Sequence, residues 1–251
     1  MIREIKKQAR LKLLNNYKFF LLPTIMYAFS NFVMISSLYA FFNGNNLFFK
    51  MLFLCLFLSF QLFVLPISIF LLYKASVGVV NEDAEKSKTI CSSVSFKDLG
   101  IIILIWLVPN VLDIVSELLD GAIEYQQLSK NITLPISLCT LIIMAVFIYL
   151  EYKYFACDYY YSLNKGTIKD TLRFSFGIMK GRFFKYLLLT LSFIHWYLLG
   201  GILSMIFAKL FGEIVFIKFA LQSIGYGVCF YLLPYQYITY ILFIKKTERR
   251  A

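Results

Sequence analysis

The sequence has few of the residues that build catalytic and metal centres. It contains one histidine, His195, and its five cysteines are scattered without a C-x-x-C pair. Zinc sites and disulfide frameworks need closely spaced ligands of these types, so neither is expected. No H-E-x-x-H, G-x-S-x-G or paired-carboxylate motif falls within an apolar span. We therefore predict a protein that is not an enzyme and that holds no cofactor and no metal.

Charged residues are also scarce. Only 16% of the 251 residues are charged, whereas 60% are hydrophobic and 19% are aromatic. Soluble domains average about 25% charged and about 45–50% apolar residues. A soluble core of this size cannot bury such an excess, so lipid is expected to surround much of the surface.

Six apolar segments are long enough to cross a bilayer, which takes about 20 helical residues. They cover approximately residues 19–42, 48–73, 99–118, 132–152, 184–207 and 219–244. The third is the least certain to cross fully, because it becomes polar after Pro109. We expect the first to be a retained span, since its basic leader is long and no A-x-A-like site follows. The sequence predicts one all-α, polytopic membrane domain over residues 1–251, with six transmembrane helices.

The positive charges predict the orientation of these spans. The net charge is +11, and 21 of the 25 Lys and Arg residues fall in the N-terminus, the 74–98 loop, the 153–185 loop and the C-terminus. Basic residues gather on the cytoplasmic side, so both termini are expected in the cytoplasm. The many Phe, Ile, Lys, Asn and Tyr residues suggest an AT-rich bacterial genome. Nucleic acid is not expected as a partner, because the positive charge faces the anionic inner leaflet.

Two shorter segments are amphipathic and are expected to lie on the cytoplasmic membrane surface. The first covers residues 2–15 and puts basic residues around a face made of Ile2, Ile5, Ala9 and Leu13. The second covers residues 167–180, from a capping-box-like Thr167 and Asp170 to a stop at Gly181. Its expected apolar stripe consists of Ile168, Leu172, Phe176 and Met179. The alternative is that this second helix docks a cytosolic protein.

The stretch "KGTIKDTLRFSFGIMKGRFFKYLLLTLSFIHW" (165–196) resembles a bacterial six-span family known as domain of unknown function 975. The similarity also includes the N-terminal "REIKKQAR". The matching motif positions are Ser175, Met179, Gly181, Leu191, Ser192, Phe193, Trp196, Gly225, Gly227, Pro234, Tyr235, Thr239 and Tyr240. His195 departs from the family pattern, which has glycine there, so this side chain should face a pocket or displace a neighbour. The resemblance implies a six-span fold and a membrane location, but no activity.

Polar side chains inside spans are candidates for function, because burying them is costly. The candidate intramembrane site consists of Gln61, Asn110, Asp113, His195 and Gln222. If the third and fifth spans touch, Asp113 and His195 could relay protons or hold a cation. The alternative is an ordinary hydrogen bond between helices beside Pro109.

Four acidic residues follow helical spacing from the third span into the next loop. Asp113, Glu117, Asp120 and Glu124 would form one stripe on a continuous helix, which we call the external acidic stripe. It could attract cations or cationic peptides, or it could be a solvated helix end.

The string "SIGYG" (223–227) resembles the "TVGYG" filter of potassium channels. Only residues 228–244 would remain for the following pore helix, and Pro234 interrupts them. We therefore predict one continuous, kinked helix over 219–244 and no channel. The small residues Gly200, Gly201, Gly225 and Gly227 are expected to allow close helix packing.

The sequence favours a non-enzymatic bacterial membrane protein, an accessory or transport-associated subunit that works with a membrane or cytosolic protein partner. The first alternative is a self-immunity protein that resists a membrane-active peptide through the external acidic stripe. The second alternative is a small-solute or proton-coupled transporter that uses Asp113 and His195.

Overall fold

The structure is a computed structural model, and it describes residues 1–81, 95–126, 130–211 and 215–249. Every regular element in these ranges is helical, and no strand occurs among them. The elements are α1 (Ile2–Asn16), α2 (Leu21–Asn43), α3 (Leu47–Ser59), α4 (Leu65–Asn81), α6 (Phe96–Gln126), α7 (Lys130–Tyr154), α8 (Cys157–Asn164), α9 (Ile168–Met179), α10 (Phe183–Leu191), α11 (Ile194–Phe211) and α12 (Val215–Glu248). The all-α prediction is confirmed.

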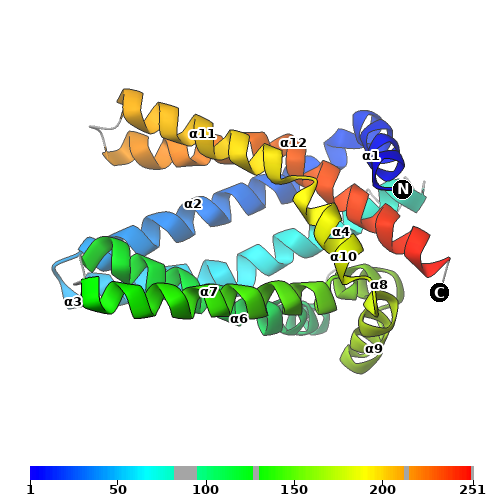
Figure 1. Cartoon of the computed structure of the whole chain (residues 1–251), viewed down its shortest axis with the longest axis horizontal. Helices are drawn as coiled ribbons and strands as arrows, with labels where there is room; N and C mark the ends of the chain where they lie inside the picture. Colours follow the sequence, from blue (N-terminus) through cyan, green and yellow to red (C-terminus); the bar gives the residue numbers. More distant parts are fainter. Residues whose placement is uncertain (82–94, 127–129, 212–214, 250–251) are drawn as a thin grey trace.

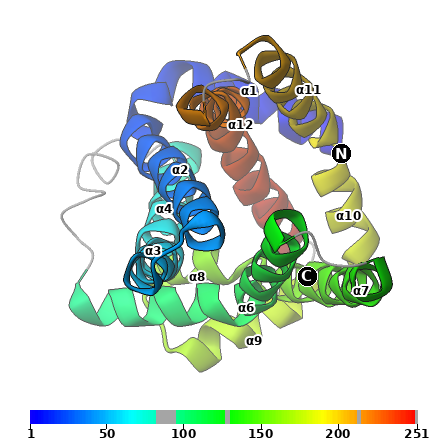
Figure 2. The ribbon, with the colours of Figure 1, turned by 90° about the vertical axis from the view of Figure 1, so that its left-hand side faces the viewer.

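Most of the long helices run side by side along the longest axis of the molecule, whereas the first part of α6 lies across this axis (Figures 1 and 2). The short helices α8 and α9, the N-terminal α1 and both chain termini gather at one end, which we call the terminal end (Figure 1). Helices α2 and α3 meet at the opposite end, through a short turn at Gly44. An arrangement with both termini at one end fits an even number of crossings.

Four helical segments of the described residues are long and apolar enough to cross a membrane. They are Ile2–Asn43, Leu47–Asn81, Leu138–Asn164 and Phe183–Gly200. The outer faces of these segments are apolar as well: Leu138, Leu141 and Ile142 on α7 are 58%, 69% and 63% exposed. Water-soluble monomers rarely leave such a continuous apolar face uncovered. The membrane character is supported, and the full set of six spans stays a prediction.

The predicted span 184–207 is two helices rather than one. Helix α10 ends at Leu191, and α11 begins at Ile194, at an angle to it (Figure 1). The break frees the carbonyl of Ser192, which accepts a hydrogen bond from the Lys6 ammonium at 2.6 Å. The ring of Phe193 is fully buried beside the break. Lys6 on α1 therefore supplies the hydrogen bond that a continuous helix would give to this carbonyl. The sequence around Ser192 does not predict this contact, because Lys6 is distant in the chain.

The continuous helix predicted for residues 219–244 is confirmed. Helix α12 extends without a break from Val215 to Glu248 and includes both Pro234 and the "SIGYG" stretch. No re-entrant loop interrupts this described segment, so the channel interpretation has no structural support. In the predicted 48–73 span, the helix widens into a π-turn at Phe60–Val64, directly before Pro66. Proline lacks the N–H that a regular helix needs there.

Both amphipathic helices form where expected, but the buried face of the second differs. In α1, Ile5, Ala9 and Leu13 are buried as predicted. In α9, the cap at Thr167 is present, yet the buried residues are Thr171, Ser175, Ile178 and Met179. Of the predicted stripe, Phe176 is 40% exposed. Met179 of the predicted stripe is buried and Leu172 is partly buried, and buried hydroxyl groups as well as apolar side chains bind this helix to its neighbours.

Candidate functional site

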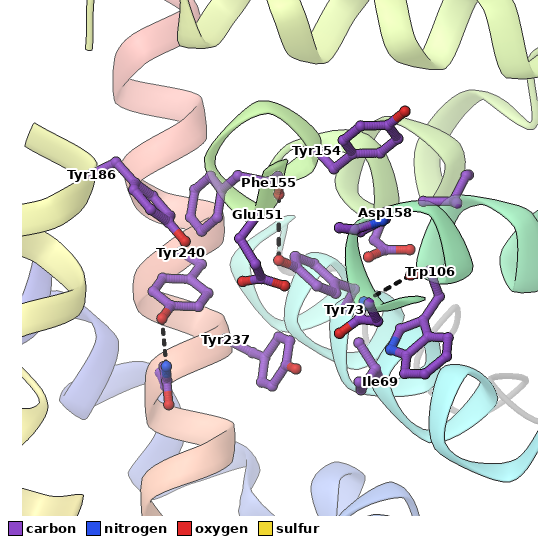
Figure 3. A pocket seen from close by; sticks show the side chains of 14 residues that line it. Ile69, Tyr73, Trp106, Glu151, Tyr154, Phe155, Asp158, Tyr186, Tyr237 and Tyr240 are labelled. Carbon is purple, nitrogen blue, oxygen red and sulfur yellow. Dashed lines mark hydrogen bonds between the residues drawn. The ribbon is translucent and has the colours of Figure 1, made fainter. Parts of the chain in front are cut away.

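A pocket of about 170 Å³ lies between helices of the bundle, and Figure 3 shows it from close by. Helices α4, α6, α7, α8, α10 and α12 all contribute to its wall. The lining residues are Ile69, Tyr73, Ile105, Trp106, Pro109, Asn110, Glu151, Tyr154, Phe155, Asp158, Tyr186, Gln236, Tyr237 and Tyr240. Segments from both halves of the chain thus enclose one polar space.

Two carboxylate side chains make the interior pocket acidic. Glu151 on α7 and Asp158 on α8 both point into it, next to the ring of Tyr73 (Figure 3). The two acids are close enough to interact electrostatically. No Lys, Arg or His is found among the described residues that line the pocket. Two neighbouring carboxylates in such surroundings repel each other unless a proton or another cation lies between them.

Tyrosines make most of the aromatic wall, and several are fixed by hydrogen bonds. Tyr73 donates its hydroxyl to the Phe155 carbonyl at 3.4 Å. On α12, Gln236 donates its amide to the Tyr240 hydroxyl and accepts from the Tyr197 hydroxyl, the latter at 2.7 Å. The rings of Phe155 and Tyr240 pack edge to face, with centroids 4.8 Å apart. The wall is therefore held by bonds from α4 to the junction of α7 and α8, and from α11 to α12.

A break between α7 and α8 positions the two acids. The chain leaves helical geometry at Phe155 and Ala156. Ser175 on α9 bridges this break, because its hydroxyl donates to the Lys153 carbonyl at 2.7 Å and accepts from Ala156 N–H at 3.1 Å. The next residue of the resemblance motif, Met179, accepts a hydrogen bond at its carbonyl from Tyr152. Helix α9 therefore fixes the helix ends that carry Glu151 and Asp158.

Asp98 holds the start of α6, another wall of the pocket, against α8. Its carboxylate accepts from Ser95 N–H at 3.0 Å, from the Tyr161 hydroxyl at 2.8 Å and from the Lys165 ammonium at 3.1 Å. Burial alone would raise the pKa of Asp98, but these hydrogen bonds lower the pKa well below its usual value. This residue was missed from sequence, although Ser95-x-x-Asp98 has the spacing of a capping box.

Three of the residues predicted for an intramembrane site can be placed. Asn110 lines the pocket and donates to the Trp106 carbonyl at 2.7 Å. Gln61 is 1% exposed in the π-turn, and its Oε1 has no hydrogen-bond partner among the described residues. His195 is exposed at the start of α11, in a separate groove. The side chains of Asp113 and Gln222 lie outside the described residues, so the Asp113–His195 pair stays a prediction.

The other predicted sites depend mostly on side chains outside the described part. The backbone of α6 is helical through all four positions of the external acidic stripe, Asp113, Glu117, Asp120 and Glu124. Gly200 is buried in α11, while the surroundings of Gly201, Gly225 and Gly227 lie outside the described residues. The stripe and the packing role of these glycines stay predictions, as does the immunity hypothesis.

Sequence reasoning also missed Glu151 and Asp158, the acids that define the pocket. The available signal was two carboxylates seven positions apart within the tyrosine-rich "EYKYFACDYYY". The break at Phe155 and Ala156 lies between them, so helical spacing alone does not place both side chains in the pocket. A metal centre does not follow, because no group of three or more His, Cys, Asp or Glu side chains converges within the described residues.

The described residues form an all-helical bundle, and four of its helical segments are long and apolar enough to be compatible with a membrane protein. The sequence matches the family described as Protein of unknown function (DUF975) over residues 1–251, and the chain belongs to this family. The resemblance noted in its C-terminal half is confirmed. Searches of curated proteins and of solved structures found no match.

Proposed function

We propose that this chain is a non-enzymatic, multi-pass protein of the bacterial cytoplasmic membrane that binds a small cationic solute in its interior pocket. A transport-associated role follows, in which solute binding is coupled to movement of the solute or to a partner subunit. The observation that carries the proposal is the pair Glu151 and Asp158, which face one pocket without a basic lining residue.

The size of the pocket limits the solute. The pocket has a volume of about 170 Å³ and is lined by residues of six helices. A small ammonium ion or a partly hydrated inorganic cation fits this space, whereas a peptide does not. The pocket therefore supports the small-solute alternative more strongly than direct binding of a peptide inside the bundle.

The wall chemistry favours an ammonium-type cation over a transition metal. Transition metals select several imidazole, thiolate or carboxylate ligands, and the pocket has two carboxylates. Tyrosine and tryptophan rings attract organic cations through their π faces, and Tyr73, Trp106 and Tyr237 line this wall. Two carboxylates with aromatic neighbours thus suit a primary or methylated ammonium group.

The orientation is supported by charge. Of the 25 basic residues, 21 lie in the segments expected on the cytoplasmic side, and the terminal end carries both termini (Figure 1). With this end in the cytoplasm, the pocket lies in the inner half of the bundle. Membrane lipid and a membrane or cytosolic protein are the expected partners.

Calorimetric titration of the purified full chain with methylammonium, tetramethylammonium, Na⁺ and K⁺ tests the proposal. We expect methylammonium to bind, and Glu151→Gln or Asp158→Asn to weaken binding at least tenfold, about 1.4 kcal/mol. Glu4→Gln is the matched control, because Glu4 is exposed on α1 and forms an ion pair with Lys246 at 3.2 Å, away from the interior pocket. No binding to any of these cations, or equal binding by all variants, would overturn the proposal.

A further inference from the structure

A second hollow lies on the outside of the terminal end, between α1, α11 and α12. It encloses about 520 Å³ and is lined by Lys6, Arg10, His195, Trp196, Tyr231 and Tyr235, with Leu14 at one side. We call it the α1 groove. It shares no lining residue with the interior pocket, so it is a separate site whose chemistry can be considered by itself.

Two positive charges face this groove from one helix. Lys6 and Arg10 are four residues apart, so they lie on the same side of α1. The Lys6 ammonium is fixed, because it donates to the Ser192 carbonyl at 2.6 Å and lies 4.1 Å from the centroid of the Phe193 ring. An ammonium group has three donors, so it can still bind a second acceptor. Arg10 is exposed, and its planar guanidinium suits phosphate oxygens.

The remaining polar lining adds to this preference for an anion. His195 is exposed in the groove and can donate a hydrogen bond to a phosphate oxygen. No Asp or Glu is present among the described residues that line the groove. An anionic group thus meets complementary charge without a nearby carboxylate to repel it.

The aromatic and apolar side chains beside the α1 groove favour a lipid over a soluble anion as its ligand. The rings of Trp196, Tyr231 and Tyr235 form a row, with Tyr231 and Tyr235 stacked at 6.0 Å between centroids. Trp and Tyr collect at the level of lipid headgroups. Leu14 beside the cations is 63% exposed, and Leu198 on α11 is 60% exposed. A charged mouth therefore adjoins an apolar helix face, which a free phosphate would leave uncovered.

We propose that the α1 groove binds the headgroup of an anionic phospholipid, with the phosphate at Lys6, Arg10 and His195 and the acyl chains along α11. Basic pockets between membrane helices on the cytoplasmic side recognise anionic headgroups in this way. The bound lipid holds the amphipathic α1 against α11 and α12. This inference does not depend on the proposed cation binding.

Native mass spectrometry of the full chain in detergent, with added lipid, tests the assignment. The probes are dioleoylphosphatidylglycerol, dioleoylphosphatidylcholine and inorganic phosphate. We expect phosphatidylglycerol to remain bound, phosphatidylcholine to bind at least tenfold more weakly, and inorganic phosphate at equal concentration not to displace the lipid. Arg10→Gln should reduce bound phosphatidylglycerol several-fold, and Lys6→Gln combined with Arg10→Gln should reduce it at least tenfold.

The control is Arg3→Gln combined with Lys7→Gln, which removes the same charge from α1 at two exposed positions outside the groove. Because Lys6 also supports the fold through Ser192, the Arg10 variant alone keeps the test valid if the double variant misfolds. Equal lipid retention by the Arg10 variant and this control would overturn the proposal. Displacement of the lipid by inorganic phosphate would assign the groove to a soluble anion instead.

Discussion

Ser175 shows how one buried hydroxyl can organise three helices. Its hydroxyl forms hydrogen bonds with the Lys153 carbonyl and the Ala156 N–H. Both backbone groups lie at the break between α7 and α8, where regular helical hydrogen bonds end. Backbone groups at helix ends need such partners when they are buried. The hydroxyl therefore determines where α8 begins and, through it, where Asp158 lies.

Ser175→Ala should destabilise the protein by about 2–3 kcal/mol, because it removes two hydrogen bonds and leaves buried backbone groups without partners. Thermal unfolding in detergent, followed by circular dichroism, measures the change. Ser162→Ala is the control, since the Ser162 hydroxyl bonds only locally to the Tyr159 carbonyl in its own helix. Equal melting temperatures for the two variants would contradict this role for Ser175.

Asp98 should make stability depend on acid pH. Because hydrogen bonds lower its pKa in the folded protein below the ordinary 3.8, the charged carboxylate stabilises the fold above that value. The contribution is lost as the pH falls below about 4 towards the lowered pKa. Asp98→Asn should therefore be less stable than the native chain at pH 7, by about 1.5–3 kcal/mol. Unfolding curves between pH 7 and pH 2.5 should show the gap closing as the pH falls, and a constant gap would rule this contribution out.

At the scale of elements, two glycines allow backbone strain to be compared with helix propensity: Gly177 lies inside α9, and Gly181 lies just beyond its end. Gly181 ends the helix with φ at +69°, a region that side chains rarely adopt, whereas Gly177 lies in the helix with regular geometry. No atom lies within 4 Å of a methyl group added at either position. Any difference between the two substitutions therefore reflects backbone conformation.

Gly181→Ala should cost about 1–2 kcal/mol, because it forces alanine into the left-handed region. Gly177→Ala should gain about 0.5–1 kcal/mol, because glycine is unfavourable inside a helix. Chemical unfolding of both variants under one condition provides the comparison. If both substitutions shift stability in the same direction, the account of this helix end is wrong.

Local patterns in the sequence predicted elements well when their causes were local. The buried face of α1 follows from apolar spacing, and the start of α9 follows from the Thr167 cap. The break before α11 could not be predicted, since it depends on Lys6, 186 positions away in the chain. The interior pocket could not be predicted for the same reason. Glu151 and Asp158 form a site only because α4, α6 and α12, which are distant in the sequence, surround them.

At the scale of the whole molecule, both termini lie at the end where α1, α8 and α9 gather (Figure 1). The basic residues concentrate in these same segments, so this end should face the cytoplasm. Fusions of green fluorescent protein to either terminus should fluoresce, because that protein folds in the cytoplasm. Alkaline phosphatase fusions at the same positions should be inactive. One active phosphatase fusion would contradict this topology.

The interior pocket is the centre of this account, and its direct test is a current recorded on a solid-supported membrane. Proteoliposomes holding the full chain are exposed to a rapid jump in methylammonium concentration. We predict a transient charge displacement as the cation enters the pocket, and its loss in the Glu151→Gln and Asp158→Asn double variant, whereas Glu4→Gln retains it. A native chain that gives no displacement, or a double variant that gives the same displacement as the native chain, would contradict the claim that these two acids bind a cation.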